Sequence, residues 1–154
     1  MKPTIDIKPL GDVLDLLPIC TRWNYDQWGR DDGETPETIS DAFARMVRDA
    51  RGEHVLVALV DGQPAGMSLL IDDDLDSHTH LRPWVAGVYV EPEFRGKGVA
   101  GALVQAAEEC ARGNGRAEAF LYTAIPDLYA RMGWSVREIL TGEHAGMALM
   151  AKTL

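Results

Sequence analysis

The chain has 154 residues, of which 46% are hydrophobic and 25% are charged, and this composition predicts one globular domain that covers residues 1–154. Its formal net charge of −9 would repel a nucleic-acid backbone, so nucleic acid is not expected as a partner. No apolar stretch approaches the length of a membrane span, so no membrane association is expected either.

The N-terminal part predicts a short strand followed by a helix. Residues 4–7 alternate in polarity, as a strand does, and residues 12–23 carry apolar side chains at helical spacing, with Pro18 as an irregularity. The same stretch lacks the unbroken apolar core of a secretory signal. We therefore expect a cytoplasmic protein.

A second helix is predicted over residues 35–50. Thr35 is a suitable cap, and Pro36 fits the first helical turn. Between the two helices, residues 22–35 are rich in aromatic and acidic side chains. They predict an irregular surface segment, where binding residues often lie.

The middle of the chain predicts three strands. Residues 54–60 and 63–71 are apolar runs joined by Asp61 and Gly62, which is typical of an antiparallel hairpin. After an acidic loop, the continuous apolar run of residues 84–90 predicts a central strand of the sheet.

The last third alternates helices and strands. Small and apolar residues at helical spacing predict a helix over residues 99–112, and a shorter one is expected over residues 126–132. Strands are predicted over residues 117–123, 134–140 and 144–152. This order predicts a mixed α/β sheet with helices on its faces.

The two cysteines, Cys20 and Cys110, have no second Cys or His at metal-ligand spacing. We therefore expect neither a disulfide framework nor a metal site, and we interpret both residues as small buried hydrophobic side chains.

The segment VEPEFRGKGVA (residues 90–100) links the central strand to the following helix. Such a turn is a ready anion site, because the first N–H groups of a helix have no partner within the helix. Gly96 and Gly98 allow a ligand to approach the bare main chain. The segment matches neither the nucleoside-triphosphate nor the dinucleotide fingerprint, so neither ligand is favoured.

Together with the helix that follows, this segment resembles the acetyl-CoA-binding motif of the Gcn5-related N-acetyltransferase (GNAT) superfamily. The motif is Arg or Gln, two residues, Gly, one residue, then Gly or Ala, and it is matched by Arg95, Gly98 and Ala100. LYARMGW (residues 128–134) resembles a later element of the family, so the similarity extends over nearly the whole chain. The chain is most similar to small bacterial members.

The resemblance implies a fold and an activity. The fold would be a mixed, mostly antiparallel sheet of six to seven strands with about four helices, splayed between its fourth and fifth strands. The activity would be transfer of an acetyl group from acetyl-CoA, as cosubstrate, to a primary amine of a small molecule or peptide, in a ternary complex. A non-catalytic acyl-CoA sensor or partner-binding module on the same fold is the alternative, and a homodimer is an option that the family leaves open.

The resemblance also implies roles for particular residues. The coenzyme pyrophosphate would lie on the main chain of Arg95, Gly96, Lys97, Gly98, Val99 and Ala100, and the pantetheine arm along Val88, Tyr89 and Val90. A main-chain N–H of that strand would polarise the thioester carbonyl. Tyr129 would protonate the leaving thiolate, for which its ordinary pKa is suited.

The acceptor side is less defined by the sequence. Trp23, Tyr25 and Trp28 are candidates for an aromatic cage around a cationic substrate. Asp73 and Asp74, which precede the central strand, are candidates for substrate binding and for the general base. Further candidates for the general base are Asp72, His78 and His80, and ordered water is the alternative to a side chain. Glu91 is expected to be a solvated turn residue.

Overall fold

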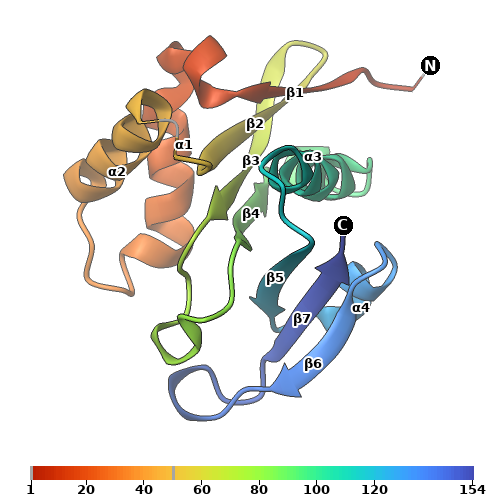
Figure 1. Ribbon diagram of the computed structural model, residues 1–154. Coiled ribbons are helices and arrows are strands. Elements are labelled where there is room, and N and C mark those ends of the chain that lie inside the picture. The colour runs from red at the N-terminus through yellow and green to blue at the C-terminus, as the bar shows by residue number, and fades with distance from the viewer. Residues whose placement is uncertain (1, 50) are drawn as a thin grey trace.

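The computed structural model describes residues 2–49 and 51–154, and its core is one seven-stranded sheet (Figure 1). From one edge to the other the strands are β1 (Ile5–Pro9), β2 (His54–Val60), β3 (Gln63–Ile71), β4 (Trp84–Val90), β5 (Glu118–Thr123), β7 (Ala148–Thr153) and β6 (Ser135–Ile139). The mixed α/β class expected from the sequence is confirmed.

The sheet divides between β4 and β5. These two strands are parallel and share a single register pair, Trp84 with Phe120, next to which the Phe120 N–H donates to the Pro83 carbonyl at 3.0 Å. The other neighbouring strands described are antiparallel. Beyond Trp84 the main chain of β4 has no partner on β5, so the expected splay between the fourth and fifth strands is confirmed.

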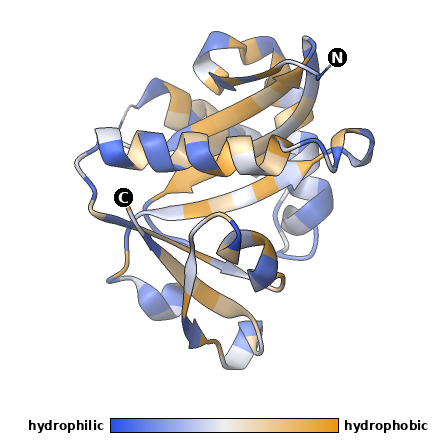
Figure 2. Ribbon diagram, turned by 90° about the vertical axis from the view of Figure 1, so that its right-hand side faces the viewer, coloured by the Kyte–Doolittle hydropathy of each residue, from blue (hydrophilic) through white to orange (hydrophobic). Residues whose placement is uncertain are grey.

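Helices cover both faces of the sheet. α1 (Leu17–Asn24) and α2 (Pro36–Arg48) lie on one face, where Trp23, Phe43 and Met46 pack against β2, β3 and β4. α3 (Val99–Gly113) and the short α4 (Pro126–Ala130) belong to the cluster on the opposite face. In Figure 2, α3 crosses the front of the view, and hydrophobic residues concentrate along the strands behind it.

A buried polar contact ties α3 to the C-terminal strands. Glu108 is almost fully buried, and its carboxylate accepts hydrogen bonds from the Lys152 ammonium at 2.8 Å and the Trp134 indole N–H at 3.2 Å. A buried charge is tolerated when it is paired in this way. The contact ties α3 to β7 and to the residue that precedes β6.

The N-terminal helix differs from the expectation. Two short 3₁₀ turns, Leu10–Asp12 and Leu14–Leu16, precede α1, which begins only at Leu17. Pro18 accounts for this start, because proline fits the first turn of a helix but not its interior.

Two further corrections concern the loops. The segment 22–35 is not irregular throughout, because α1 continues to Asn24 and a π-helical turn, Tyr25–Gly29, follows it. The last strand begins at Ala148 rather than at residue 144, since a 3₁₀ turn, Gly142–His144, lengthens the connection from β6. Residue 50, the expected end of the second helix, lies outside the described residues.

Candidate active site

The splay begins at an irregularity in β4. The register between β3 and β4 shifts between Met67 and Leu69, and Gly87 in the facing part of β4 has a φ of +56°. A Cβ at Gly87 would lie 3.0 Å from the Leu69 side chain, so glycine is favoured both by the dihedral angle and by the space. A bulge of this kind turns main-chain groups out of the ladder, here beside the open edge of β4.

The turn after β4 presents main-chain N–H groups to open space. Gly96 and Gly98 have φ values of +75° and +85°, and Gly98 is the cap residue of α3 with no side-chain cap. A Cβ at either glycine would meet nothing within 4 Å, so positive φ, rather than crowding, requires glycine here. The space over the N-terminus of this 15-residue helix is therefore open to an anion.

The two cations of the turn behave differently. The Arg95 Nε–H donates to the Val90 carbonyl at 2.9 Å, and its guanidinium lies 5.9 Å from the centre of the Tyr89 ring. Lys97 is exposed, and the described part of the chain gives it no salt bridge. Arg95 therefore helps to shape the turn, whereas Lys97 is free to reach a ligand.

Tyr129 lies in α4 with its ring packed in the α3 cluster and only 8% of the residue exposed. Within residues 2–49 and 51–154, the Tyr129 hydroxyl takes part in no hydrogen bond. Every fully buried side-chain oxygen or nitrogen in the same residues does have a hydrogen-bond partner, so this hydroxyl is not fully buried. The hydroxyl must therefore reach solvent-accessible space. Burial raises the pKa of Tyr129, so at neutral pH it carries the proton that a general acid needs.

The structure separates the two candidate carboxylates Asp73 and Asp74. Asp73 is exposed and accepts two hydrogen bonds from the Arg82 guanidinium, at 2.9 and 3.1 Å. Asp74 is partly buried and has no such partner among the described residues. Burial raises the pKa of Asp74 to about 6, the charge of His144 lowers it, and the charge of Asp32 raises it.

Two residues that the sequence did not single out interact electrostatically with Asp74. The rings of Tyr122 and His144 have centres 4.9 Å apart, and Tyr122 also packs edge-on against Trp84 at the closed end of the splay. Burial raises the pKa of Tyr122 to about 12, and the charge of Asp74 adds to this. The charges of Asp32 and His144 act on the pKa of Asp74, and the charge of Asp74 acts on that of Tyr122. These four residues come from four separate segments and are here called the acceptor cluster. No local motif marks these residues, so no signal in a single sequence could have found them together.

The three candidate aromatics do not share one cage. Trp23 is 4% exposed and packs on Tyr89 with ring centres 5.7 Å apart. Tyr25 is covered by the Arg30 guanidinium, 5.0 Å from its ring centre, and Trp28 is 38% exposed. Of the three, Trp28 has the most surface to offer a ligand.

Glu91 is not the solvated turn residue expected from the sequence. It is partly buried, and its Oε1 accepts hydrogen bonds from the Trp23 indole N–H at 2.6 Å and the Tyr89 hydroxyl at 3.0 Å. The expectation failed because Trp23, the donor from α1, is distant in the sequence, where spacing does not reveal the contact. Tyr89 lies two residues before Glu91 and therefore on the same side of the extended chain.

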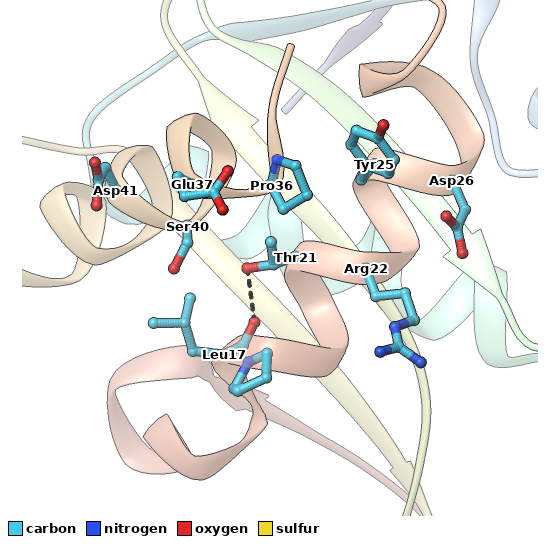
Figure 3. Close-up of a pocket in the computed structure, with 10 residues that line it drawn as sticks. Leu17, Thr21, Arg22, Tyr25, Asp26, Pro36, Glu37, Ser40 and Asp41 are labelled. Atoms are coloured by element: carbon cyan, nitrogen blue, oxygen red, sulfur yellow. Dashed lines mark hydrogen bonds between the residues drawn. The ribbon is translucent and has the colours of Figure 1, made fainter.

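A separate groove of about 500 Å³ lies between α1 and α2 (Figure 3). Its walls include Thr21, whose hydroxyl donates to the Leu17 carbonyl at 2.8 Å, and the charged side chains of Arg22, Asp26, Glu37 and Asp41. The groove does not include the α3 turn or the acceptor cluster, so we do not assign it to the candidate site.

Comparison with known proteins identifies the class of this arrangement. Residues 51–136 match the family model of an acetyltransferase (GNAT) domain, which is more than half of the chain. The chain therefore belongs to the GNAT acetyltransferase family, and the resemblance drawn from the sequence is confirmed. A search of curated proteins finds no match.

Solved structures of N-acetyltransferases share the fold. A GCN5-related N-acetyltransferase from Ralstonia eutropha JMP134 is 25% identical, with a TM-score of 0.66 over 90% of this chain and 97% of its own. An aminoglycoside 6'-N-acetyltransferase complexed with coenzyme A is 13% identical, with a TM-score of 0.75 over 96% of each chain. The dodecameric spermidine N-acetyltransferase from Vibrio cholerae is 16% identical, with a TM-score of 0.70 over 97% of this chain and 93% of its own.

Two other observations bear on the kind of protein. Among the described residues, no three His, Cys, Asp or Glu side chains gather as a metal site would require. None of the described helices is long and apolar enough to cross a bilayer.

Proposed function

We propose that this protein is an N-acetyltransferase that transfers an acetyl group from acetyl-CoA to a primary amine of a small molecule or peptide. The observation that carries the proposal is the open Gly96–Gly98 turn at the start of α3, directly beside the unpaired edge of β4. One element offers N–H groups to a pyrophosphate, and the other offers strand-like pairing to an amide-rich arm.

In this proposal the main chain binds the coenzyme. N–H groups from Gly96 to Ala100 hold the pyrophosphate, because the Arg95 N–H already donates to the Pro92 carbonyl at 3.3 Å. Lys97 adds positive charge, and Val88, Tyr89 and Val90 pair with the pantetheine arm. When bound, the thioester supplies the activated acetyl group. A main-chain N–H at the β4 bulge stabilises the negative charge that develops on its carbonyl oxygen.

The acceptor side then supplies the proton transfers. Asp74 takes the proton from the amine nitrogen as this nitrogen bonds to the carbonyl carbon, and Tyr129 gives its proton to the sulfur as the carbon–sulfur bond breaks. A base with a pKa of about 6 is largely ionised at neutral pH and still basic enough to act. Trp28 and Asp32 lie on the same segment after α1 and would contact the rest of the acceptor.

The acidic surroundings favour a cationic acceptor. The charges of Asp32, Asp74 and Glu143 all raise the pKa of Tyr122. A substrate that carries a second positive charge would be attracted to such a site. The structural neighbours that act on spermidine and aminoglycosides make these two amine classes the first to test. A cytoplasmic location, one domain over residues 1–154 and a homodimer stay predictions.

The test combines binding with turnover. Acetyl-CoA binding is measured by calorimetry, and release of free thiol is followed over a panel of polyamines, aminoglycosides, amino acids and peptides. Binding in the micromolar range together with amine-dependent thiol release supports the proposal. Binding without release by any amine would favour the sensor alternative, and absence of binding would overturn both.

A further inference from the structure

The carboxylate of Glu91 connects three parts of the molecule. Its Oε1 accepts hydrogen bonds from Trp23 in α1, at 2.6 Å, and from Tyr89 in β4, at 3.0 Å. Glu91 itself is the first residue after β4 and opens the turn that leads to Gly96 and Gly98. The contact therefore joins the helix on the acceptor face to the start of the coenzyme turn.

Both donors depend on this carboxylate. Trp23 is 4% exposed, and its indole N–H has no other partner among the described residues. Burial raises the pKa of Tyr89, and its hydrogen bond to Glu91 adds to this, so the hydroxyl remains a donor. Hydrogen bonds to an ionised acceptor are stronger than neutral ones, and a buried donor left unpaired is costly.

The coenzyme turn has its own main-chain and side-chain support. The Glu91 N–H donates to the Ala65 carbonyl at 2.8 Å, the Phe94 N–H to the Glu91 carbonyl at 2.9 Å, and the Arg95 Nε–H to the Val90 carbonyl at 2.9 Å. None of these bonds uses the Glu91 side chain. Loss of the carboxylate would therefore leave the turn in place and loosen the contact between α1 and the end of β4, while Cys20 and Trp23 keep α1 packed in the core.

The position of α1 matters because it continues into the acceptor face. The π-helical turn after α1 carries Trp28, and Asp32 of the acceptor cluster follows it. Asn24, the last residue of α1, has its side-chain Nδ2 3.7 Å from the place that a Cβ on Gly87 would occupy. A shift of α1 would thus move the wall that faces the β4 bulge.

We propose that Glu91 is a positioning residue that holds α1 against the end of β4 and thereby sets the acceptor wall relative to the coenzyme. The part of this inference that concerns the acceptor rests on the proposed function. Glu91 does not touch the reacting atoms, and its role needs a hydrogen-bond acceptor rather than a base.

Three variants test this. Glu91→Gln keeps an acceptor oxygen for Trp23 and Tyr89, Glu91→Leu removes it, and Glu93→Leu is the matched control because Glu93 is exposed in the same turn. Tyr89→Phe removes only one of the two donors to Glu91, and it replaces Glu91→Leu as the test variant if Glu91→Leu does not fold. Each is measured by hydrogen exchange of the α1 amides, acetyl-CoA binding and steady-state kinetics with an amine acetylated by the wild type.

We expect Glu91→Leu to speed exchange in α1 and to raise the KM for the amine about tenfold, with acetyl-CoA affinity within about threefold of wild type. Tyr89→Phe should act in the same direction more weakly. Glu91→Gln should restore both α1 protection and the KM, with the pH profile of kcat unchanged.

Two results would overturn the inference. If Glu91→Gln lost turnover while α1 stayed protected, the carboxylate would be acting on protons. If the α1 amides exchanged at the same rate in Glu91→Leu as in Glu93→Leu, Glu91 would not hold α1 in position. Should the wild type acetylate no amine, the proposed function fails, and the exchange data alone still decide whether Glu91 holds α1.

Discussion

The two sides of the candidate site are built differently. The proposed coenzyme side is one continuous piece of chain, from Val88 to Ala100, in which the main chain would do most of the binding. The proposed acceptor side draws on side chains of four separate segments, represented by Asp32, Asp74, Tyr122 and His144. The first depends on backbone dihedral angles, and the second depends on packing.

This difference has a consequence for how each side tolerates change. A main-chain site is insensitive to most side-chain substitutions but fails when a required glycine is replaced. A side-chain site can change its charge or shape through single substitutions and keep its scaffold, as expected when function is carried on a common fold. Substitutions on the coenzyme side should therefore abolish binding, whereas those on the acceptor side should alter rate and pH dependence.

The largest effect is expected for Gly98→Glu. A side chain at φ +85° is strained, and the added carboxylate would repel a pyrophosphate at the N-terminus of α3. We expect acetyl-CoA affinity to fall at least about 100-fold by calorimetry. A carboxylate at this end of a helix is favourable for the helix itself, so the loss would not reflect unfolding of α3.

Gly115→Glu is the matched control for this change. Gly115 follows the other end of α3, has a φ of +80°, and also faces open space. It should lose at least about 1 kcal/mol of stability, more than Gly98→Glu, because a carboxylate at the C-terminus of a helix is unfavourable, and it should retain acetyl-CoA binding. Equal affinity in the two variants would show that the turn at Gly98 is not the anion site.

Tyr129→Phe should give the next largest effect. Because no described residue bonds to the Tyr129 hydroxyl, its removal should leave the melting temperature within a few degrees of wild type. We expect kcat to fall about 100-fold while the dissociation constant of acetyl-CoA stays within about threefold. An unchanged kcat would remove Tyr129 from the mechanism.

The turn after β4 was the part of the candidate site whose structure the sequence predicted well. Gly96 and Gly98 adjoin each other in a short motif between an apolar strand and an alanine-rich helix, so local chemistry was sufficient to predict the turn. The splay followed only from the family resemblance, since strand order and pairing depend on contacts between distant parts of the chain. The predicted start of α1 was wrong because Pro18, interpreted from the sequence as an irregularity within the helix, lies in its first turn.

The acceptor side could not be predicted because its residues meet only in the fold. Tyr122 lies in a strand and His144 in a loop, and nothing in their neighbours indicates that their rings meet. Asp73 and Asp74 are adjacent and equivalent in sequence, yet Arg82 pairs with one, and burial acts on the other. The prediction that Glu91 is solvated was wrong for the same reason, since its partner Trp23 lies 68 residues away.

Asp74→Asn should separate stability from activity. The pKa of Asp74 is raised from 3.8 to about 6 in the folded protein, so the folded state binds the proton more tightly than the unfolded state. Ionisation of Asp74 therefore lowers stability as the pH rises through about 6. The variant should be more stable than wild type by about 1 to 3 kcal/mol at pH 8, and this gain should vanish below about pH 4.

The same variant should lose activity. We expect kcat to fall at least about tenfold at pH 8, and the decline of wild-type kcat below about pH 6 should disappear from the variant. Asp73→Asn is the control, because it breaks an exposed pair with Arg82 and should change neither stability nor kcat by much. If Asp74→Asn kept the wild-type pH profile, another group or ordered water would serve as the base.

The smallest effect is expected for the cysteines, and it tests whether transfer is direct. Cys20 is fully buried in α1, and burial raises its pKa to about 12, so it carries no thiolate at neutral pH. Burial also raises the pKa of Cys110. Cys20→Ala with Cys110→Ser should keep kcat within about twofold, at a stability cost of about 1 kcal/mol for the small cavity at Cys20. Loss of turnover in a variant that melts like wild type would mean that a thiol carries the acetyl group, and the amine would then not attack the coenzyme thioester directly.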